Sequence, residues 1–212
     1  MLKPSKVYVK TLGCKVNSFD SNVIKNQFVE GGCTLVSDPK DASVIVVNSC
    51  SVTATAEKEA RYLFRKYTKD NPRSLKVITG CYAQVGEESL NKLPEVDLVV
   101  PNEAKNLLMS EIQKKLDPQS APSVSDEKPQ KKKFLQFKSS VALFDQPKIE
   151  TTRAVIKIQD GCNDFCAYCQ IPYARGTSIS VPQEDVLKQV KYVISQGVPE
   201  ITLTGIHIGD YG

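Results

Sequence analysis

The segment ASVIVVNSC, residues 42–50, decides the fold that this sequence predicts. Its centre, residues 44–47, is an unbroken run of β-branched residues, which favour strands. A strand without polar alternation is typical of a parallel sheet whose two faces are both covered by helices. The segment therefore predicts a buried parallel strand, and Cys50 stands at its carboxyl end.

The same pattern, a strand and then a helix, continues on both sides of this segment. Further strands are predicted at residues 6–12, 75–81 and 96–101, and helices at residues 20–30, 52–70, 83–92 and 103–116. Asp20 is the expected N-cap of the first helix, which Gly31 and Gly32 should end. Strands that alternate with helices predict an α/β fold, here an open parallel sheet over residues 1–116.

Residues 117–147 interrupt this pattern, and we expect them to form a linker. Their first part, residues 117–133, is rich in Pro and Ser and then becomes basic. Two interpretations remain open for Lys131, Lys132 and Lys133: they contact phosphate, or they are the solvated end of the linker.

Residues 148–212 return to alternating strands and helices. A strand is predicted at residues 153–162, a helix at 181–196 and another strand at 200–209. Roughly two strands and one helix are too few to close a barrel or to cover a sheet on both faces. We therefore expect this chain to be a fragment of a longer protein.

The composition indicates a protein of the cytoplasm. The sequence has no run of apolar residues long enough to span a bilayer, and its first residues, MLKPSKVYVK, lack the apolar core of a signal peptide. A net charge of +4 is too small to argue for a nucleic-acid partner by itself. In a reducing compartment the 7 cysteines favour metal binding or chemistry over disulfides.

Three cysteines of the first domain occupy equivalent positions. Cys14, Cys50 and Cys81 each stand at the carboxyl end of a predicted strand. Because the carboxyl ends of parallel strands meet at one edge of the sheet, these thiols should converge there. Thiolates favour zinc and iron–sulfur clusters, so we expect a metal or cluster site. Cys33 lies before a strand, on the opposite edge, and is interpreted as a core residue.

The second group of cysteines is local. Cys162, Cys166 and Cys169 form a C-x3-C-x2-C motif after the first strand of the second domain. Three thiolates on a four-iron cluster leave one iron without a protein ligand, which is where a substrate or cofactor would bind. A structural zinc site is the alternative. It would need a fourth ligand, and the single histidine, His207, is distant in sequence.

Five ordered motifs resemble one family of enzymes. They are TLGCKVNSFDS, VVNSCSVTATAEKEAR, ITGCYAQ, GCNDFCAYCQIPYARG and LTGIHIGDYG. Together they resemble the radical S-adenosylmethionine tRNA methylthiotransferases, over the whole chain apart from the linker. TLGCKVN and GIHIGDYG are most similar to the branch that acts on N6-threonylcarbamoyladenosine. The branches that act on isopentenyladenosine in tRNA or on a ribosomal protein are alternatives, and a non-catalytic iron–sulfur or zinc protein is a further one.

The resemblance implies a fold and a set of cofactors. A methylthiotransferase N-terminal domain, residues 1–116, would precede the start of a radical S-adenosylmethionine (β/α) barrel, a partial TIM barrel, over residues 148–212. Each group of three cysteines would hold a [4Fe–4S] cluster. The cluster on Cys162, Cys166 and Cys169 would bind S-adenosylmethionine and cleave it to a 5′-deoxyadenosyl radical, and the other would carry or donate the inserted sulfur. The residues implied to contact S-adenosylmethionine are Tyr168, Thr202, Thr204 and Gly205.

The resemblance also implies a reaction and partners. The enzyme, a transferase, would place a methylthio group at C2 of the modified adenosine beside the anticodon. Its partners would be the tRNA anticodon stem-loop and an electron donor such as flavodoxin or ferredoxin, and we expect a monomer. An aromatic C–H bond is beyond side-chain acid–base chemistry, so the cofactor must supply the radical. We expect the fragment alone to be inactive.

A few polar residues remain with two interpretations each. Arg175 could bind a carboxylate or phosphate of the substrate, or form a surface salt bridge. His207 and Asp210 could contact the threonyl group, or belong to an ordinary loop. Asn17, Asn48 and Ser49 could bond to cluster sulfurs, or satisfy loop backbone. The sequence departs from the family where RGTSISVP has Ile179 and Val181 near places at which relatives carry arginine.

Overall fold

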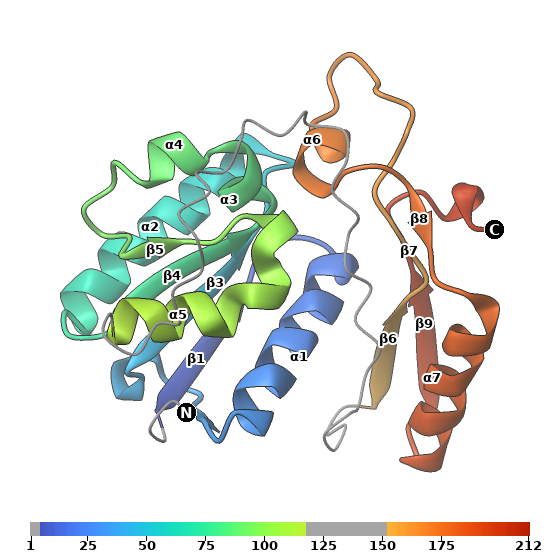
Figure 1. Cartoon of the computed structure of the whole chain (residues 1–212), viewed down its shortest axis with the longest axis horizontal. Helices are drawn as coiled ribbons and strands as arrows, with labels where there is room; N and C mark the ends of the chain where they lie inside the picture. The colour runs from blue at the N-terminus through green and yellow to red at the C-terminus, as the bar shows by residue number, and fades with distance from the viewer. Residues whose placement is uncertain (1–4, 118–151) are drawn as a thin grey trace.

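The computed structural model describes residues 5–117 and 152–212, and its N-terminal half is built on a parallel sheet (Figure 1). The sheet has the order β2-β1-β3-β4-β5, and all neighbouring strands are parallel. Its strands are β1 (Lys6–Thr11), β2 (Thr34–Leu35), β3 (Val44–Ser49), β4 (Leu75–Gly80) and β5 (Leu98–Val99). The expected α/β fold is confirmed, and β3, the strand of the opening segment, is buried at every residue.

Helices cover both faces of this sheet. On one face lie α1 (Lys15–Glu30) and α5 (Leu108–Leu116), which pack with Val44, Val46 and Val77 of the strands. On the other face lie α2 (Ala54–Asp70), α3 (Cys81–Val85) and α4 (Glu87–Leu90), which pack with Ile45, Val47 and Ile78. The apolar run of β3 therefore serves both layers, since its successive side chains point to opposite faces. A 3-10 helix, η1 (Pro39–Asp41), precedes β3, and another, η2 (Asn102–Leu107), precedes α5.

The second domain contains more elements than the sequence predicts. Strands β6 (Arg153–Lys157) and β9 (Glu200–Thr204) pair in parallel, and β7 (Gln159–Asp160) and β8 (Ile179–Ser180) pair antiparallel. The helices are α6 (Ile171–Arg175), α7 (Gln183–Ser195) and the 3-10 turn η3 (Ile208–Asp210). The chain bends after Lys157, so the predicted strand at 153–162 becomes two, and the predicted strand at 200–209 ends at Thr204.

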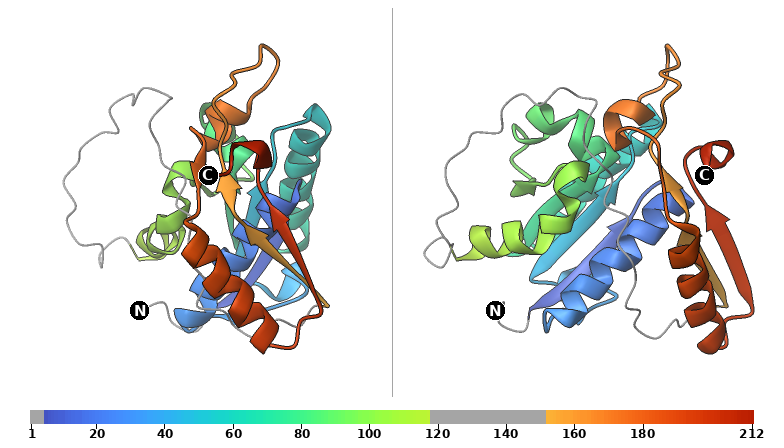
Figure 2. Two further views of the ribbon diagram at one scale, coloured as in Figure 1. Left: turned by 90° about the vertical axis from the view of Figure 1, so that its right-hand side faces the viewer. Right: turned by 45° about the vertical axis from the view of Figure 1, so that its right-hand side comes forward.

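Strand β6 is covered on both faces, and one cover comes from the first domain. Ala154 and Ile156 of β6 pack against α7 in an apolar core. Lys157 points the other way and contacts α1. Helix α1 therefore lies between the five-stranded sheet and β6, as Figure 1 and the right-hand view of Figure 2 show. The elements of the second domain alone do not cover both faces, as expected: the second cover of β6 is α1 of the first domain, and Leu203 of β9 is 47% exposed.

Two further expectations need comment. The first helix begins at Lys15, five residues before Asp20, and Cys14 is its N-cap. Asp20 is therefore inside the helix and is not a cap. Cys33 is buried among apolar side chains below the amino end of the sheet, as expected.

The linker beyond residue 117, with Lys131, Lys132 and Lys133, lies outside the described residues. Within the described ranges, no helix is long and apolar enough to cross a membrane.

Candidate functional site

The three cysteines of the first domain follow three adjacent strands. Cys14 follows β1, Cys50 follows β3 and Cys81 follows β4, and these strands are neighbours in the sheet. Cys14 is exposed, whereas Cys50 and Cys81 are 5% and 2% exposed. Burial raises the pKa of the Cys81 thiol, and a negative charge on Cys50 would raise it further. The sheet thus brings these cysteines to one edge, as its topology requires.

Glycines before two of these cysteines permit the close approach. Gly13 has φ +93°, and a Cβ there would lie 2.6 Å from Cβ and 2.8 Å from Sγ of Cys50. Gly80 has φ +92°, and a Cβ there would lie 2.5 Å from the carbonyl oxygen of Ser49. Both positions need a residue without a side chain, because an L-residue is strained at such φ and would also clash. The Gly–Cys pairs therefore let neighbouring loops meet at the thiols.

The side-chain amides of Asn17 and Asn48 hold the loops that carry these cysteines in place. Asn17 donates from Nδ2 to the carbonyl oxygens of Leu12 (2.8 Å) and Ser49 (2.9 Å), which connects the loops that carry Cys14 and Cys50. Asn48 donates from Nδ2 to the carbonyl oxygen of Asn17 (2.9 Å). Asn17 and Asn48 are fully buried. These bonds satisfy loop backbone, which was one of the two interpretations of the sequence, and they fix where the cysteines stand.

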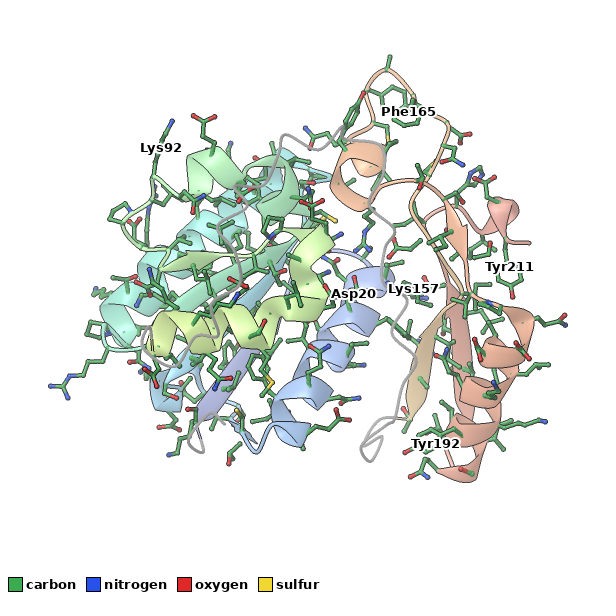
Figure 3. All side chains as sticks on the ribbon, in the orientation of Figure 1. Asp20, Lys92, Lys157, Phe165, Tyr192 and Tyr211 are labelled. Atoms are coloured by element: carbon green, nitrogen blue, oxygen red, sulfur yellow. The ribbon has the colours of Figure 1, made fainter. Side chains whose placement is uncertain are left out.

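A cluster of five charged residues joins the two domains next to these cysteines. This interdomain charge cluster consists of Asp20 on α1, Lys105 on η2, Lys157 on β6, Asp160 on β7 and Arg175 on α6. All five are buried or nearly so: the side chain of Lys105 is 13% exposed, that of Asp20 7%, and the others are at 2% or below. Asp20 and Lys157 point toward one another from α1 and β6 (Figure 3).

The contacts within the cluster are short and charge-assisted. Lys157 Nζ lies 2.7 Å from Asp20 Oδ1 and 2.7 Å from Asp160 Oδ2. Lys105 Nζ lies 3.0 Å from Asp20 Oδ2. Arg175 Nη1 lies 3.0 Å from Asp160 Oδ1 and 3.3 Å from Asp20 Oδ2, and its Nη2 donates to Asn17 Oδ1. Carboxylates of both domains thus share the same cations.

The pKa values of the cluster reflect this mutual dependence. Burial alone would raise the pKa of both carboxyls, but the neighbouring cations outweigh it. They hold the pKa of Asp20 far below its usual range and lower that of Asp160 to about 2. Burial opposes the charge on Arg175, yet Asp160 raises its pKa. Burial lowers the pKa of Lys105 despite Asp20. The carboxylates and the cations at the contact between the domains therefore stabilise each other's charged forms.

This placement corrects the sequence analysis of Arg175. We expected a group that binds substrate or a surface salt bridge. The guanidinium is instead buried, at 1% exposure, and bonds to Asp160, Asp20 and Asn17. A side chain so enclosed makes neither a surface salt bridge nor a contact with a substrate in solution. Pattern reasoning also missed Lys157 and Asp160, although charged residues in the apolar strand AVIKIQD were a usable signal.

The second cysteine motif forms an open loop after β7. Cys162 and Cys169 are partly exposed and Cys166 is exposed. The backbone N–H of Cys162 donates to the carbonyl oxygen of Gly176 (3.1 Å), and that of Cys169 to Cys166 (2.9 Å). Tyr168, between them, is 92% exposed. Helix α6, which follows the motif directly, packs against α3, which begins at Cys81. The loop is therefore anchored beside the first group of cysteines.

His207 and Asp210 lie beside this loop. His207 Nδ1 is 3.2 Å from Asp210 Oδ2 and 3.3 Å from Asp164 Oδ2. Potential ligand atoms of Cys162, Asp164 and His207 all lie within 4.8 Å of one another. The sequence analysis expected neither contact: it left His207 and Asp210 as a contact to the threonyl group or as part of an ordinary loop. Distance along the chain therefore does not separate His207 from the cysteine motif.

The residues implied to contact S-adenosylmethionine end strand β9. Thr202 and Thr204 point to the same face as Val155 and Lys157, their register partners on β6. At Gly205 a Cβ would lie 2.9 Å from Gln159 Oε1. The same Oε1 accepts from the backbone N–H groups of Ile206 (2.9 Å) and His207 (2.8 Å). Gln159, which the sequence analysis overlooked, thus shapes the end of β9. Near it, Ile179 is partly buried in β8 and Val181 belongs to the apolar core.

The donor set at the first-domain edge fits an iron–sulfur cluster. Three cysteines follow adjacent strands at this edge, and thiolates are the ligands of such clusters. Three buried polar atoms without a hydrogen-bond partner within the described residues are Ser51 Oγ, next in sequence to Cys50, Thr79 Oγ1, two residues before Cys81, and Arg175 Nε. Each can donate to a sulfur, which is the usual outer contact of these clusters. The C-x3-C-x2-C loop offers the same ligand type, with its thiols open to solvent.

Comparison with known families agrees with this arrangement. The model described as uncharacterized protein family UPF0004 matches residues 6–101, and that of the radical SAM superfamily matches residues 156–211. The first segment contains one group of three cysteines and the second contains the other. Asp20 of the first matched segment pairs with Lys157 and Arg175 of the second, so the two matched segments contact one another within the interdomain charge cluster.

Individual relatives resemble nearly the whole chain. The threonylcarbamoyladenosine tRNA methylthiotransferase of Aquifex aeolicus is 39% identical over 207 residues, 98% of this chain and 49% of the relative. Its counterpart in Bacillus subtilis is 37% identical, over 95% of this chain and 44% of the relative. A tRNA-2-methylthio-N(6)-dimethylallyladenosine synthase of Francisella tularensis is 33% identical, over 100% of this chain and 47% of the relative. The chain spans about half the length of the curated relatives it matches.

Proposed function

Because the chain belongs to the family of radical S-adenosylmethionine tRNA methylthiotransferases, we propose that the protein transfers a methylthio group to C2 of N6-threonylcarbamoyladenosine in tRNA. The proposed cofactors are S-adenosylmethionine and two [4Fe–4S] clusters, one for each group of three cysteines. When bound, the cluster on Cys162, Cys166 and Cys169 supplies the electron that cleaves S-adenosylmethionine. The observation that supports the proposal is that α6, which directly follows the second three-cysteine motif, packs against α3, which begins at Cys81 of the first group.

The rest of the proposal assigns tasks to this chain's own residues. Thr202, Thr204 and Gly205, at the end of β9, bind the amino-acid part of S-adenosylmethionine. Tyr168 covers its adenine, for which an exposed ring is available. His207 and Asp210 face the substrate from η3, because both are exposed beside the cysteine loop. The anticodon stem-loop is the proposed partner, a flavodoxin or ferredoxin the electron donor, the monomer the working form and the cytoplasm the place of action.

Similarity favours threonylcarbamoyladenosine over isopentenyladenosine as the modified base. The relatives from Aquifex aeolicus and Bacillus subtilis that carry the first name are 39% and 37% identical, against 33% for the Francisella tularensis protein that carries the second. Isopentenyladenosine is the second candidate, because the same comparisons include it at nearly equal identity.

Nucleoside analysis tests the function and the substrate together. The gene is deleted, bulk tRNA is hydrolysed, and 2-methylthio nucleosides are measured by mass spectrometry. The proposal expects loss of 2-methylthio-N6-threonylcarbamoyladenosine and its return when the intact gene is restored, but not when Cys166→Ala is restored. An unchanged level of that nucleoside would rule out the substrate. Loss of the isopentenyl counterpart instead would establish the second candidate.

A further inference from the structure

The interdomain charge cluster has one positive charge in excess. Within the described residues, three cations, Lys105, Lys157 and Arg175, face two carboxylates, Asp20 and Asp160. Burying an unbalanced charge is costly, since neither water nor a counter-ion stabilises it. A buried arrangement of this kind calls for a further negative group close by.

The cysteines of the first domain occupy the required place. Asn17 accepts from Arg175 through Oδ1 and, through Nδ2, holds the loops that lead to Cys14 and Cys50. Helix α6, which ends at Arg175, packs against α3, which begins at Cys81. Burial opposes the charge on Arg175, but negative charge on Cys81 or Cys14 would raise the pKa of its guanidinium. The excess charge therefore lies beside the first group of cysteines, although Arg175 belongs to the second domain.

Arg175 also keeps one donor unused. Its side chain is 1% exposed, and its buried Nε has no hydrogen-bond acceptor among the residues that the structure describes. A guanidinium has five N–H donors, and those on Nη1 and Nη2 already bond to Asp160, Asp20 and Asn17. A buried donor left without an acceptor is unfavourable, so an acceptor is expected in this space.

We propose that Arg175 serves the cluster of the opposite domain: its charge compensates a four-iron cluster on Cys14, Cys50 and Cys81, and its Nε–H donates to a sulfur there. The charges agree, because a four-iron, four-sulfide cluster held by three thiolates carries about −1 in its oxidised form. This inference rests on the proposed function, which places that cluster in the first domain. Reduction adds one electron and makes the cluster more negative, so the guanidinium favours the reduced form and raises the reduction potential.

The test isolates the first cluster and varies Arg175. The protein carries Cys162→Ser, Cys166→Ser and Cys169→Ser, is reconstituted anaerobically with iron and sulfide, and is titrated redox-potentiometrically with detection by electron paramagnetic resonance. Arg175→Gln should lower the ratio of reduced to oxidised cluster at a fixed potential at least tenfold, which is about 59 mV for one electron. Arg175→Lys keeps the charge and loses the Nε–H donor, so it should lower the ratio of reduced to oxidised cluster by less than Arg175→Gln does.

Lys76 offers a matched control. It is 4% exposed and paired with Asp97 at 3.4 Å, but it stands at the amino end of β4, opposite Cys81. Lys76→Gln should leave the potential unchanged. If Arg175→Gln does not fold, Lys105→Gln decides, because it removes the excess charge and leaves Arg175 in place: a lowered potential supports the inference, and an unchanged one overturns it.

The outcomes separate this inference from the proposed function. If the triple serine protein takes up no iron, the first-domain cluster itself is refuted, and the inference falls with it. If it takes up iron normally and Arg175→Gln has the potential of the parent, only the inference is refuted. If Lys76→Gln lowers the reduction potential as much as Arg175→Gln does, the inference is also refuted, because the effect would then not depend on the position of the charge.

Discussion

Replacing Asp20 by Asn tests whether buried charge holds the two domains together. The substitution keeps the size of the side chain and removes its charge. Asp20 Oδ1 lies 2.7 Å from Lys157 Nζ, and Oδ2 lies 3.0 Å from Lys105 Nζ and 3.3 Å from Arg175 Nη1. In the variant Lys157 and Arg175 keep only the carboxylate of Asp160, and Lys105 loses its carboxylate partner, in a largely buried site.

The expected loss of stability follows from that burial. Removing one partner of a buried ion pair costs about 3–5 kcal/mol, because the other charge remains buried and uncompensated. That cost is a large part of the about 5–15 kcal/mol that stabilises a typical folded protein. Asp20 belongs to the first domain and two of its three partners to the second, so the loss should fall on the contact between the domains.

Urea unfolding followed by far-ultraviolet circular dichroism measures this cost in the metal-free protein. We expect a lower midpoint for Asp20→Asn, or two separate transitions if the domains come apart. The control is Glu88→Gln, which removes an exposed pair with Lys92 at 2.9 Å and should change little. A single transition weakened by less than about 1 kcal/mol in Asp20→Asn would refute the role given to the charge cluster.

Three further predictions concern acid, a glycine and a cysteine. The lowered pKa of Asp160, about 2 against an ordinary value of 3.8, contributes stability above pH ~4 that should be lost as pH falls toward 2, by about 2 kcal/mol in acid unfolding. Gly80→Ala should cost more in urea unfolding than Gly197→Ala: both have positive φ, but only Gly80 would bring Cβ against backbone. Cys33→Ala should retain the bound iron that Cys50→Ala loses, since Cys33 is buried near the opposite edge; equal losses would contradict this.

The sequence predicts the first domain well because its signals are local. An apolar β-branched run such as residues 44–47 has few alternatives to a buried parallel strand, and strand ends then place Cys14, Cys50 and Cys81 together. The start of the first helix was misjudged because Asp20 resembles a cap. Its side chain is in fact needed five residues inside the helix, to pair with Lys157.

The contact between the domains is harder to predict, because its partners are distant in sequence. Asp20 and Arg175 are separated by 155 residues and Asp20 and Lys157 by 137. No periodicity or motif connects such pairs, and each charge alone suggests a solvated surface. Only the placement of α1 against β6 shows why an aspartate, a lysine and an arginine are buried together.

Counting iron in cysteine variants tests the central claim, that each group of three cysteines holds its own four-iron cluster. After anaerobic reconstitution the unchanged protein should bind about eight irons and as many sulfides. Replacing Cys14, Cys50 and Cys81 by Ala should leave about four, and replacing Cys162, Cys166 and Cys169 should leave the other four. Stoichiometric zinc without iron, or a replacement of either group that removes all iron at once, would contradict the account.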